Sequence, residues 1–122
     1  MSERGISFVT LIATRFPGLA AVLSEHIKEN IGEVLPHVFF GDLTRYVVSL
    51  VLATNSGGGL APRRELHEIL NLLEETFVSG EEGLRELIAG SFLENLPRPD
   101  EEGSKVLAML GPTLTAQLRK MG

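Results

Sequence analysis

The amino-acid sequence predicts an all-α fold, and three observations support that class. Apolar residues recur at spacings of three and four through most of the 122-residue chain, which is the pattern of one face of an amphipathic helix. The alternation of apolar and polar residues that marks a half-buried strand is nearly absent. Proline and glycine interrupt the helical pattern at intervals that fit short globular helices. We therefore expect six to seven helices in a single domain over residues 1–122, packed as antiparallel helical hairpins in a loosely α-solenoid-like arrangement.

Two helices are predicted in the first quarter of the chain. The apolar spacing of residues 7–16 indicates the first, and Pro17 both ends it and opens the second, because proline is tolerated at a first helical position. The second helix carries an apolar stripe that includes His26. Gly32 and Pro36 follow it, and these residue types commonly end helices.

The segment 38–53 is predicted to be the central helix. Valine, leucine and phenylalanine fill most of its circumference, as expected of a helix that is covered on several sides. Its polar residues Asp42, Arg45 and Ser49 are spaced three and four apart, so they form one solvated stripe. We interpret Asp42 and Arg45 as an ion pair on the exposed side of an otherwise buried helix.

A glycine-rich stretch divides the chain after this helix. Residues 55–62, with the sequence NSGGGLAP, are predicted to be a flexible connector, because three consecutive glycines do not hold a helix. A fourth helix follows, and Ser79 with Glu82 three residues later suggests a capping box at the start of a fifth. The short break between these two favours an antiparallel pair. Two shorter helices are expected at 106–110 and 112–121.

The charge of the chain is uneven. Residues 62–102 contain 11 acidic and 4 basic side chains, a net charge of −7, whereas the remainder is +2 and the whole chain is −5. A nucleic-acid partner held by phosphate contacts is therefore disfavoured, and a basic protein partner is favoured. A solvated helix face is the simpler interpretation of the same charges. The partner-binding carboxylates that we expect on the outer face of the fourth and fifth helices are Glu68, Glu75, Glu82 and Glu86.

Residues that carry chemistry are few. The chain has no cysteine, which excludes disulfides and thiolate metal sites, and none of its three histidines stands in a HExxH motif. His26 has Glu25 and Glu29 nearby, but we interpret it as a partly exposed helix histidine rather than as a metal ligand. We expect no metal and no cofactor.

A secondary candidate site consists of His37, Asp42 and Arg45. A histidine paired with an aspartate can act as an oriented base, and His37 precedes Asp42 by five residues. No nucleophile motif accompanies the pair, since Ser49 lacks the residues of a nucleophile elbow. We interpret His37 as structural and expect the protein not to be an enzyme.

Neither a signal peptide nor a membrane span is predicted. The N-terminal residues lack a long apolar core, and the longest apolar-rich run, 38–53, is short and contains Asp42 and Arg45. A cytoplasmic protein is expected.

Three stretches together carry a family resemblance. The segments GEVLPHVFFGDLTRYVV (32–48), LLEETFVSGEEGLRELIAGSFLENLP (72–97) and MLGPTL (109–114) resemble a family of short, uncharacterised bacterial proteins, some of which lie near toxin genes as immunity proteins do. Glycines 57–59 have no counterpart in the resemblance. It implies an all-helical binding protein and supplies no catalytic residues.

The expected function is binding to another protein. The acidic second half and the absence of catalytic motifs favour an immunity protein or an inhibitor of a basic toxin or effector enzyme. The alternative is a helical-repeat adaptor or homodimerising scaffold that binds a peptide in an apolar groove. An uncovered apolar stripe would distinguish the alternative, because soluble monomers rarely expose large apolar patches.

Overall fold

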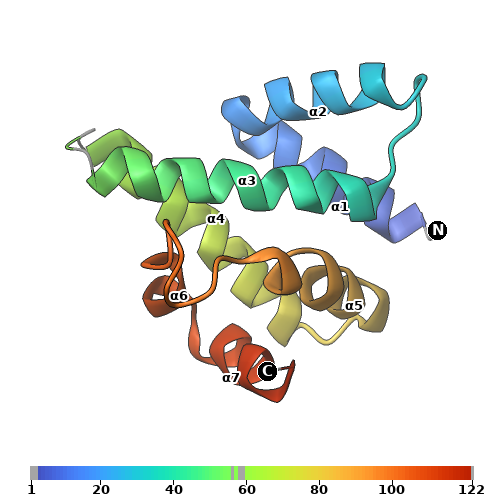
Figure 1. The fold of residues 1–122 in the computed structure, drawn as a ribbon. Coiled ribbons are helices and arrows are strands. Elements are labelled where there is room, and N and C mark those ends of the chain that lie inside the picture. Colours follow the sequence, from blue (N-terminus) through green and yellow to red (C-terminus); the bar gives the residue numbers. More distant parts are fainter. Residues whose placement is uncertain (1–2, 56, 58–59, 122) are drawn as a thin grey trace.

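The computed structural model describes residues 3–55, 57 and 60–121 (Figure 1). The described residues form seven α-helices, one short 3-10 helix and no strand, so the predicted all-α class is confirmed. The elements run in the order α1 (Glu3–Arg15), α2 (Pro17–Glu29), α3 (Pro36–Asn55), α4 (Leu60–Val78), α5 (Glu82–Ser91), η1 (Leu93–Asn95), α6 (Val106–Met109) and α7 (Pro112–Met121).

Helices α1 and α2 form an antiparallel hairpin (Figure 1), and the break between them falls at Pro17, as predicted. Pro17 is the first residue of α2, where its missing N–H costs no hydrogen bond. The turn is tight because the carbonyl of Phe16 accepts from the N–H groups of Leu19 and Ala20, at 2.9 and 3.1 Å. Beyond α2 the chain reverses at Gly32, whose φ of 82° lies in the left-handed region that glycine adopts without strain.

Helix α3 is the centre of the fold, as predicted. It packs against α1, α2, α4 and α5, and its side chains Phe39, Phe40, Leu43 and Val47 are fully buried. Val38, which we expected to belong to the covered apolar circumference of this helix, is 48% exposed. The solvent-facing side of α3 is therefore partly apolar.

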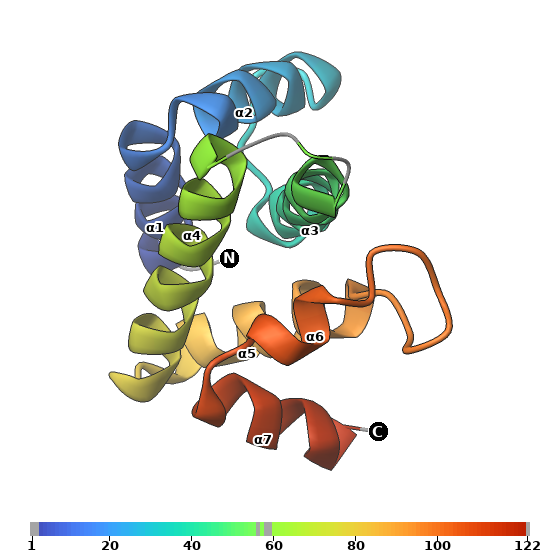
Figure 2. The same cartoon turned by 90° about the vertical axis from the view of Figure 1, so that its left-hand side faces the viewer.

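The helices close around α3 rather than forming an open stack of hairpins. Helix α1 contacts α5, and α4 contacts α7, although neither pair is adjacent in the sequence. Helices α4 and α5 cross steeply instead of lying antiparallel (Figure 2). A solenoid repeat touches only its neighbours, so these long-range contacts distinguish this domain from a solenoid.

Helices occupy both ends of the predicted connector 55–62. Helix α3 extends to Asn55 and α4 begins at Leu60. Gly57 is in a turn with φ 84°. Gly58 and Gly59 lie outside the described residues.

The start of α5 differs from the predicted capping box. Glu81 is the N-cap, and its carboxylate accepts from the N–H of Leu84 at 2.7 Å. The Ser79 hydroxyl donates instead to the Thr76 carbonyl, in the last turn of α4. Gly80, with φ 85°, separates the two helices, so the cap falls one residue after this glycine rather than before it.

Helix α7 is attached to the core by a carboxylate from α4. Glu74 accepts from the N–H groups of Thr113 and Leu114, both at 2.9 Å, and thereby satisfies two of the free donors at the start of α7. Gly111 allows this approach, because a Cβ there would overlap the Glu74 side chain.

Candidate functional site

The four predicted partner-binding carboxylates are all exposed on the surface. Glu68 and Glu75 are seven residues apart on α4, so they lie on one side of that helix. Glu82 and Glu86 are four apart at the start of α5, which packs against α4. Within the described part of the chain, none of the four forms an ion pair. We call this set the acidic face.

A shallow hollow lies beside the α5 part of the acidic face. Its volume is about 250 Å³, and Glu82, Glu86, Phe77 and Arg85 contribute to its walls. The Arg85 guanidinium lies over the Phe77 ring, 4.7 Å from the centroid, in a cation–π contact. The hollow therefore places two carboxylates beside an arginine whose guanidinium covers an almost fully buried aromatic ring.

The secondary candidate residues do not converge. Asp42 and Arg45 pair as predicted, within one turn of α3, and the Arg45 side chain is 74% exposed. His37 is exposed and does not face Asp42, because its Nδ1 lies 2.8 Å from the Ser91 hydroxyl on α5. The Ser91 side chain is buried, and no acid is paired with His37 in the described structure. A base held by a third group beside an accessible nucleophile is therefore not assembled from these residues.

Asp42 has a different histidine partner, which the sequence did not reveal. Its carboxylate lies 3.6 Å from Nδ1 of His26, and His26 is only 1% exposed, which corrects the expectation of a partly exposed histidine. The backbone N–H of Leu35 donates to the Nε2 of His26 at 2.9 Å. Nε2 is thus an acceptor, which assigns the ring hydrogen of a neutral imidazole to Nδ1, and both the Asp42 carboxylate at 3.6 Å and the Asn30 amide nitrogen at 3.3 Å lie near that atom.

Asp42 and His26 are arranged like the Asp–His pair of a catalytic site, but their role here is structural. The nitrogen that would take a proton from a substrate is already occupied by Leu35 N–H, inside the protein. The Asn30 amide nitrogen adds a bond of 2.7 Å to the His26 carbonyl at the end of α2. Together these contacts fix the turn that leads from α2 into α3.

Among the described residues, no cluster of three or more histidine and carboxylate side chains is placed to hold a metal ion. In the same residues, no helix has the length and apolar character needed to cross a membrane.

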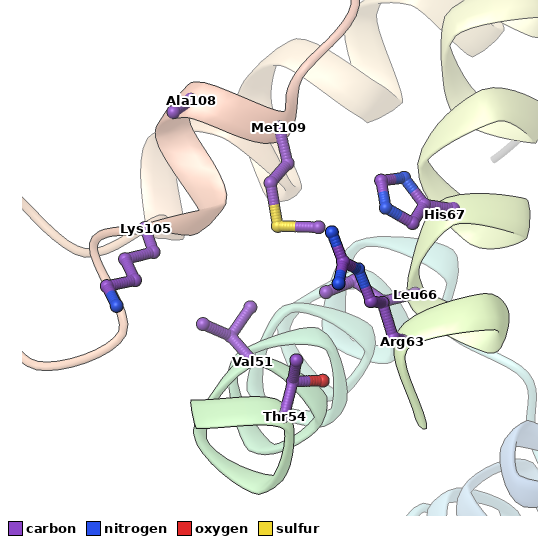
Figure 3. Close-up of a pocket in the computed structure, with 8 residues that line it drawn as sticks. All are labelled: Val51, Thr54, Arg63, Leu66, His67, Lys105, Ala108 and Met109. Carbon is purple, nitrogen blue, oxygen red and sulfur yellow. The ribbon is translucent and has the colours of Figure 1, made fainter. Parts of the chain in front are cut away.

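A cleft that the sequence did not predict lies between α3, α4 and α6 (Figure 3). Its volume is about 420 Å³, and Arg63, His67 and Lys105 line it together with apolar side chains. Arg63 and His67 are four residues apart on α4, a spacing that places them on one side of the helix. Lys105 comes from the segment before α6, so only tertiary packing brings the three together.

These features define an all-helical domain with an exposed acidic face and a separate basic cleft. The chain belongs to the family described as Domain of unknown function (DUF7674), and the match spans residues 9–121. No curated protein and no solved structure matches the chain. The expected resemblance to an uncharacterised family is thereby confirmed, and the described residues of this chain are helical as that resemblance implied.

Proposed function

We propose that the protein is a binding domain whose acidic face recognises a basic surface on another protein. The observation that carries the proposal is the exposure of Glu68, Glu75, Glu82 and Glu86, with no cation paired to any of them in the described structure. Carboxylates without an internal partner are free to accept the paired N–H groups of arginine on a partner. The surrounding net charge of −7 over residues 62–102 would speed the encounter with a basic partner.

The hollow beside Glu82 and Glu86 supports the same proposal. Interfaces gain most of their binding energy from a few aromatic or arginine anchors that fill a pocket. The carboxylates of Glu82 and Glu86 favour a positively charged group at the rim, beside Arg85, and the recess has room for the stem of that side chain. A basic side chain with an aliphatic stem meets both requirements.

The finer proposal is that the partner is a basic toxin or effector enzyme and that this chain is its immunity protein or inhibitor in a bacterial cytoplasm. Its support is the acidic asymmetry, the small size and the resemblance given by the quoted segments. The acidic face would then cover a basic substrate-binding surface on the enzyme.

The test is binding to the purified protein encoded beside this one, measured by calorimetry at about 50 mM and about 500 mM salt. The double variant Glu75→Lys with Glu82→Lys should lose binding and keep its melting temperature. The control is Glu25→Lys with Glu29→Lys, which makes the same charge change on exposed residues of α2, a helix that has no α4 or α5 among its main contacts. Equal loss in both double variants would mean that net charge, and not the acidic face, governs binding.

A second candidate function, homodimerisation or peptide binding, is favoured by apolar groups on α1. Ile6 and Leu11 are 39% and 50% exposed, and Leu11 lines a hollow of about 570 Å³ with Phe8 and Leu84. Light scattering over a range of protein concentrations tests the dimer, and Leu11→Glu should return any dimer to a monomer. A wild-type monomer at every concentration removes the dimer from consideration.

A further inference from the structure

The basic cleft between α3, α4 and α6 has a charge opposite to that of the chain as a whole. Arg63, His67 and Lys105 line it, and none of the described residues that line it is acidic. Neither Arg63 nor Lys105 forms an ion pair with any described residue. In a protein of net charge −5, two cations without an ion-pair partner among the described residues therefore line one recess together with an imidazole.

The positions of these groups suit an anion at the mouth of the cleft. Figure 3 shows the Arg63 and His67 side chains extending from α4 towards Met109, with Lys105 at the opposite rim. The planar guanidinium of an arginine matches the geometry of a carboxylate or phosphate group with two parallel N–H donors. An imidazole four residues further along the helix can donate a third hydrogen bond.

The rest of the cleft is apolar. Val51 and Leu66, which are 2% and 0% exposed, form the buried floor beneath the recess, and the Met109 side chain extends into it beside Arg63 (Figure 3). Methionine adapts to ligands of different shape because its side chain is unbranched and polarizable. A volume of about 420 Å³ lies within the usual range for small-molecule sites.

We propose that this cleft binds a small organic anion, in which a carboxylate or phosphate head pairs with Arg63 and a short apolar body lies against Val51, Leu66 and Met109. This binding site is separate from the acidic face, because none of the four glutamates of the acidic face lines the cleft. The proposal therefore does not depend on the proposed protein partner.

A second hollow provides an internal comparison. It lies between η1, α6 and α7, has a similar volume of about 480 Å³, and is lined by Met121 among other apolar side chains. Its two charged lining residues, Glu94 and Arg98, have opposite signs, so it has no preference for an anion. Met109 and Met121 are thus reporters of the two recesses, and the chain contains only three methionines.

The experiment follows the ¹³C-methyl signals of methionine during titration with sodium hexanoate and, separately, hexyl phosphate. Hexanol and hexylammonium carry the same apolar chain without the negative charge. We expect the Met109 signal, assigned with Met109→Leu, to shift and saturate with the anions, while Met121 responds little. The two anions distinguish a carboxylate head from a phosphate head. Hexanol and hexylammonium should bind at the cleft at least about tenfold more weakly, as judged from the Met109 signal. Tenfold in affinity corresponds to the loss of one charge-assisted hydrogen bond.

The variants isolate the contribution of Arg63. Arg63→Gln should weaken the binding of the anions about tenfold, whereas Arg64→Gln, an equal charge change at an exposed neighbour that does not line the cleft, should leave it unchanged. Both are exposed residues, and circular dichroism will verify that the fold is retained. The proposal is overturned if hexanol shifts Met109 as strongly as hexanoate does, if the two arginine variants behave alike, or if neither anion saturates the Met109 signal.

Discussion

Single buried or half-buried polar residues hold the first three helices in position. Asp42 touches both Arg45 in its own helix and His26 from α2, and its side chain is 23% exposed. The contact with Arg45 is close to solvent and contributes little, as exposed ion pairs do. The contact with His26 lies on the buried side of Asp42, where water screens it less, so we expect it to contribute more.

We expect Asp42→Ala to lower the melting temperature by a few degrees, consistent with about 1 kcal/mol in a domain of this size. Arg45→Ala should have a smaller effect, since Arg45 is the exposed member of the pair. Thermal melting by circular dichroism provides both values. Equal losses in the two variants would show that His26 adds nothing to the role of Asp42.

Tyr46 provides a second test at the residue scale. Burial, the hydrogen bond to Glu65 at 2.8 Å and the charge of that carboxylate raise the pKa of Tyr46 from 10.0 to about 12. The contribution of the phenol to stability is therefore complete below about pH 10 and is lost as the pH rises through about 12.

Because Tyr46 is the only tyrosine in the chain, ultraviolet absorbance during an alkaline titration reports on it alone. We expect ionisation well above pH 10 in the wild type and a lower pKa in Glu65→Gln, which removes the carboxylate charge. If Tyr46 of the wild type ionises at the pKa of an unfolded chain while circular dichroism still shows a folded protein, the Tyr46–Glu65 contact is contradicted.

At the scale of elements, the attachment of α7 depends on one carboxylate. Partial burial raises the pKa of Glu74, but the N–H groups of Leu114 and Thr113 outweigh it, so the pKa is lowered overall from 4.5. The stabilisation by this carboxylate is complete above about pH 4.5 and is lost as the pH falls through the lowered pKa of the folded state.

Glu74→Ala should therefore cost about 1 kcal/mol near neutral pH, comparable to the loss of a helix N-cap. The difference from wild type should be smaller at an acidic pH below about 4.5, because the stabilisation is lost as the wild-type carboxylate becomes protonated. Urea unfolding at the two pH values measures the difference, and hydrogen exchange should show faster opening of α7. A cost that does not change with pH would mean that the Glu74 charge is irrelevant to the cap.

At the scale of the whole molecule, four helices share α3 as their support. A cavity in α3 should weaken every contact with α1, α2, α4 and α5 together, so the domain should unfold as one unit. The fully buried Leu43 is the appropriate position for such a cavity.

We expect Leu43→Ala to lower the free energy of unfolding by about 2–5 kcal/mol. Its transition should still be single, with the same midpoint by circular dichroism and by methyl NMR. Separate midpoints for the first three helices and for α4–α7 would show that the chain contains two cooperative units. The control is Ala53→Gly, which lies outside the buried core near the end of the same helix. It should lower the free energy of unfolding by about 1 kcal/mol through the loss of helix propensity alone.

The sequence by itself determined the all-α class, the central place of α3, the break at Pro17 and the exposure of the four acidic-face glutamates. Each of these depends on the spacing of apolar residues within one helix, which is a local property. Only the tertiary structure decided which of two neighbouring glutamates is free: Glu75 faces solvent, whereas Glu74 caps α7, about 40 residues further along the chain. It likewise placed His26 rather than His37 beside Asp42, and gathered Arg63, His67 and Lys105 around one cleft. Such contacts join residues from different helices, so they depend on how the helices pack, and periodicity along one helix contains no information about its neighbours.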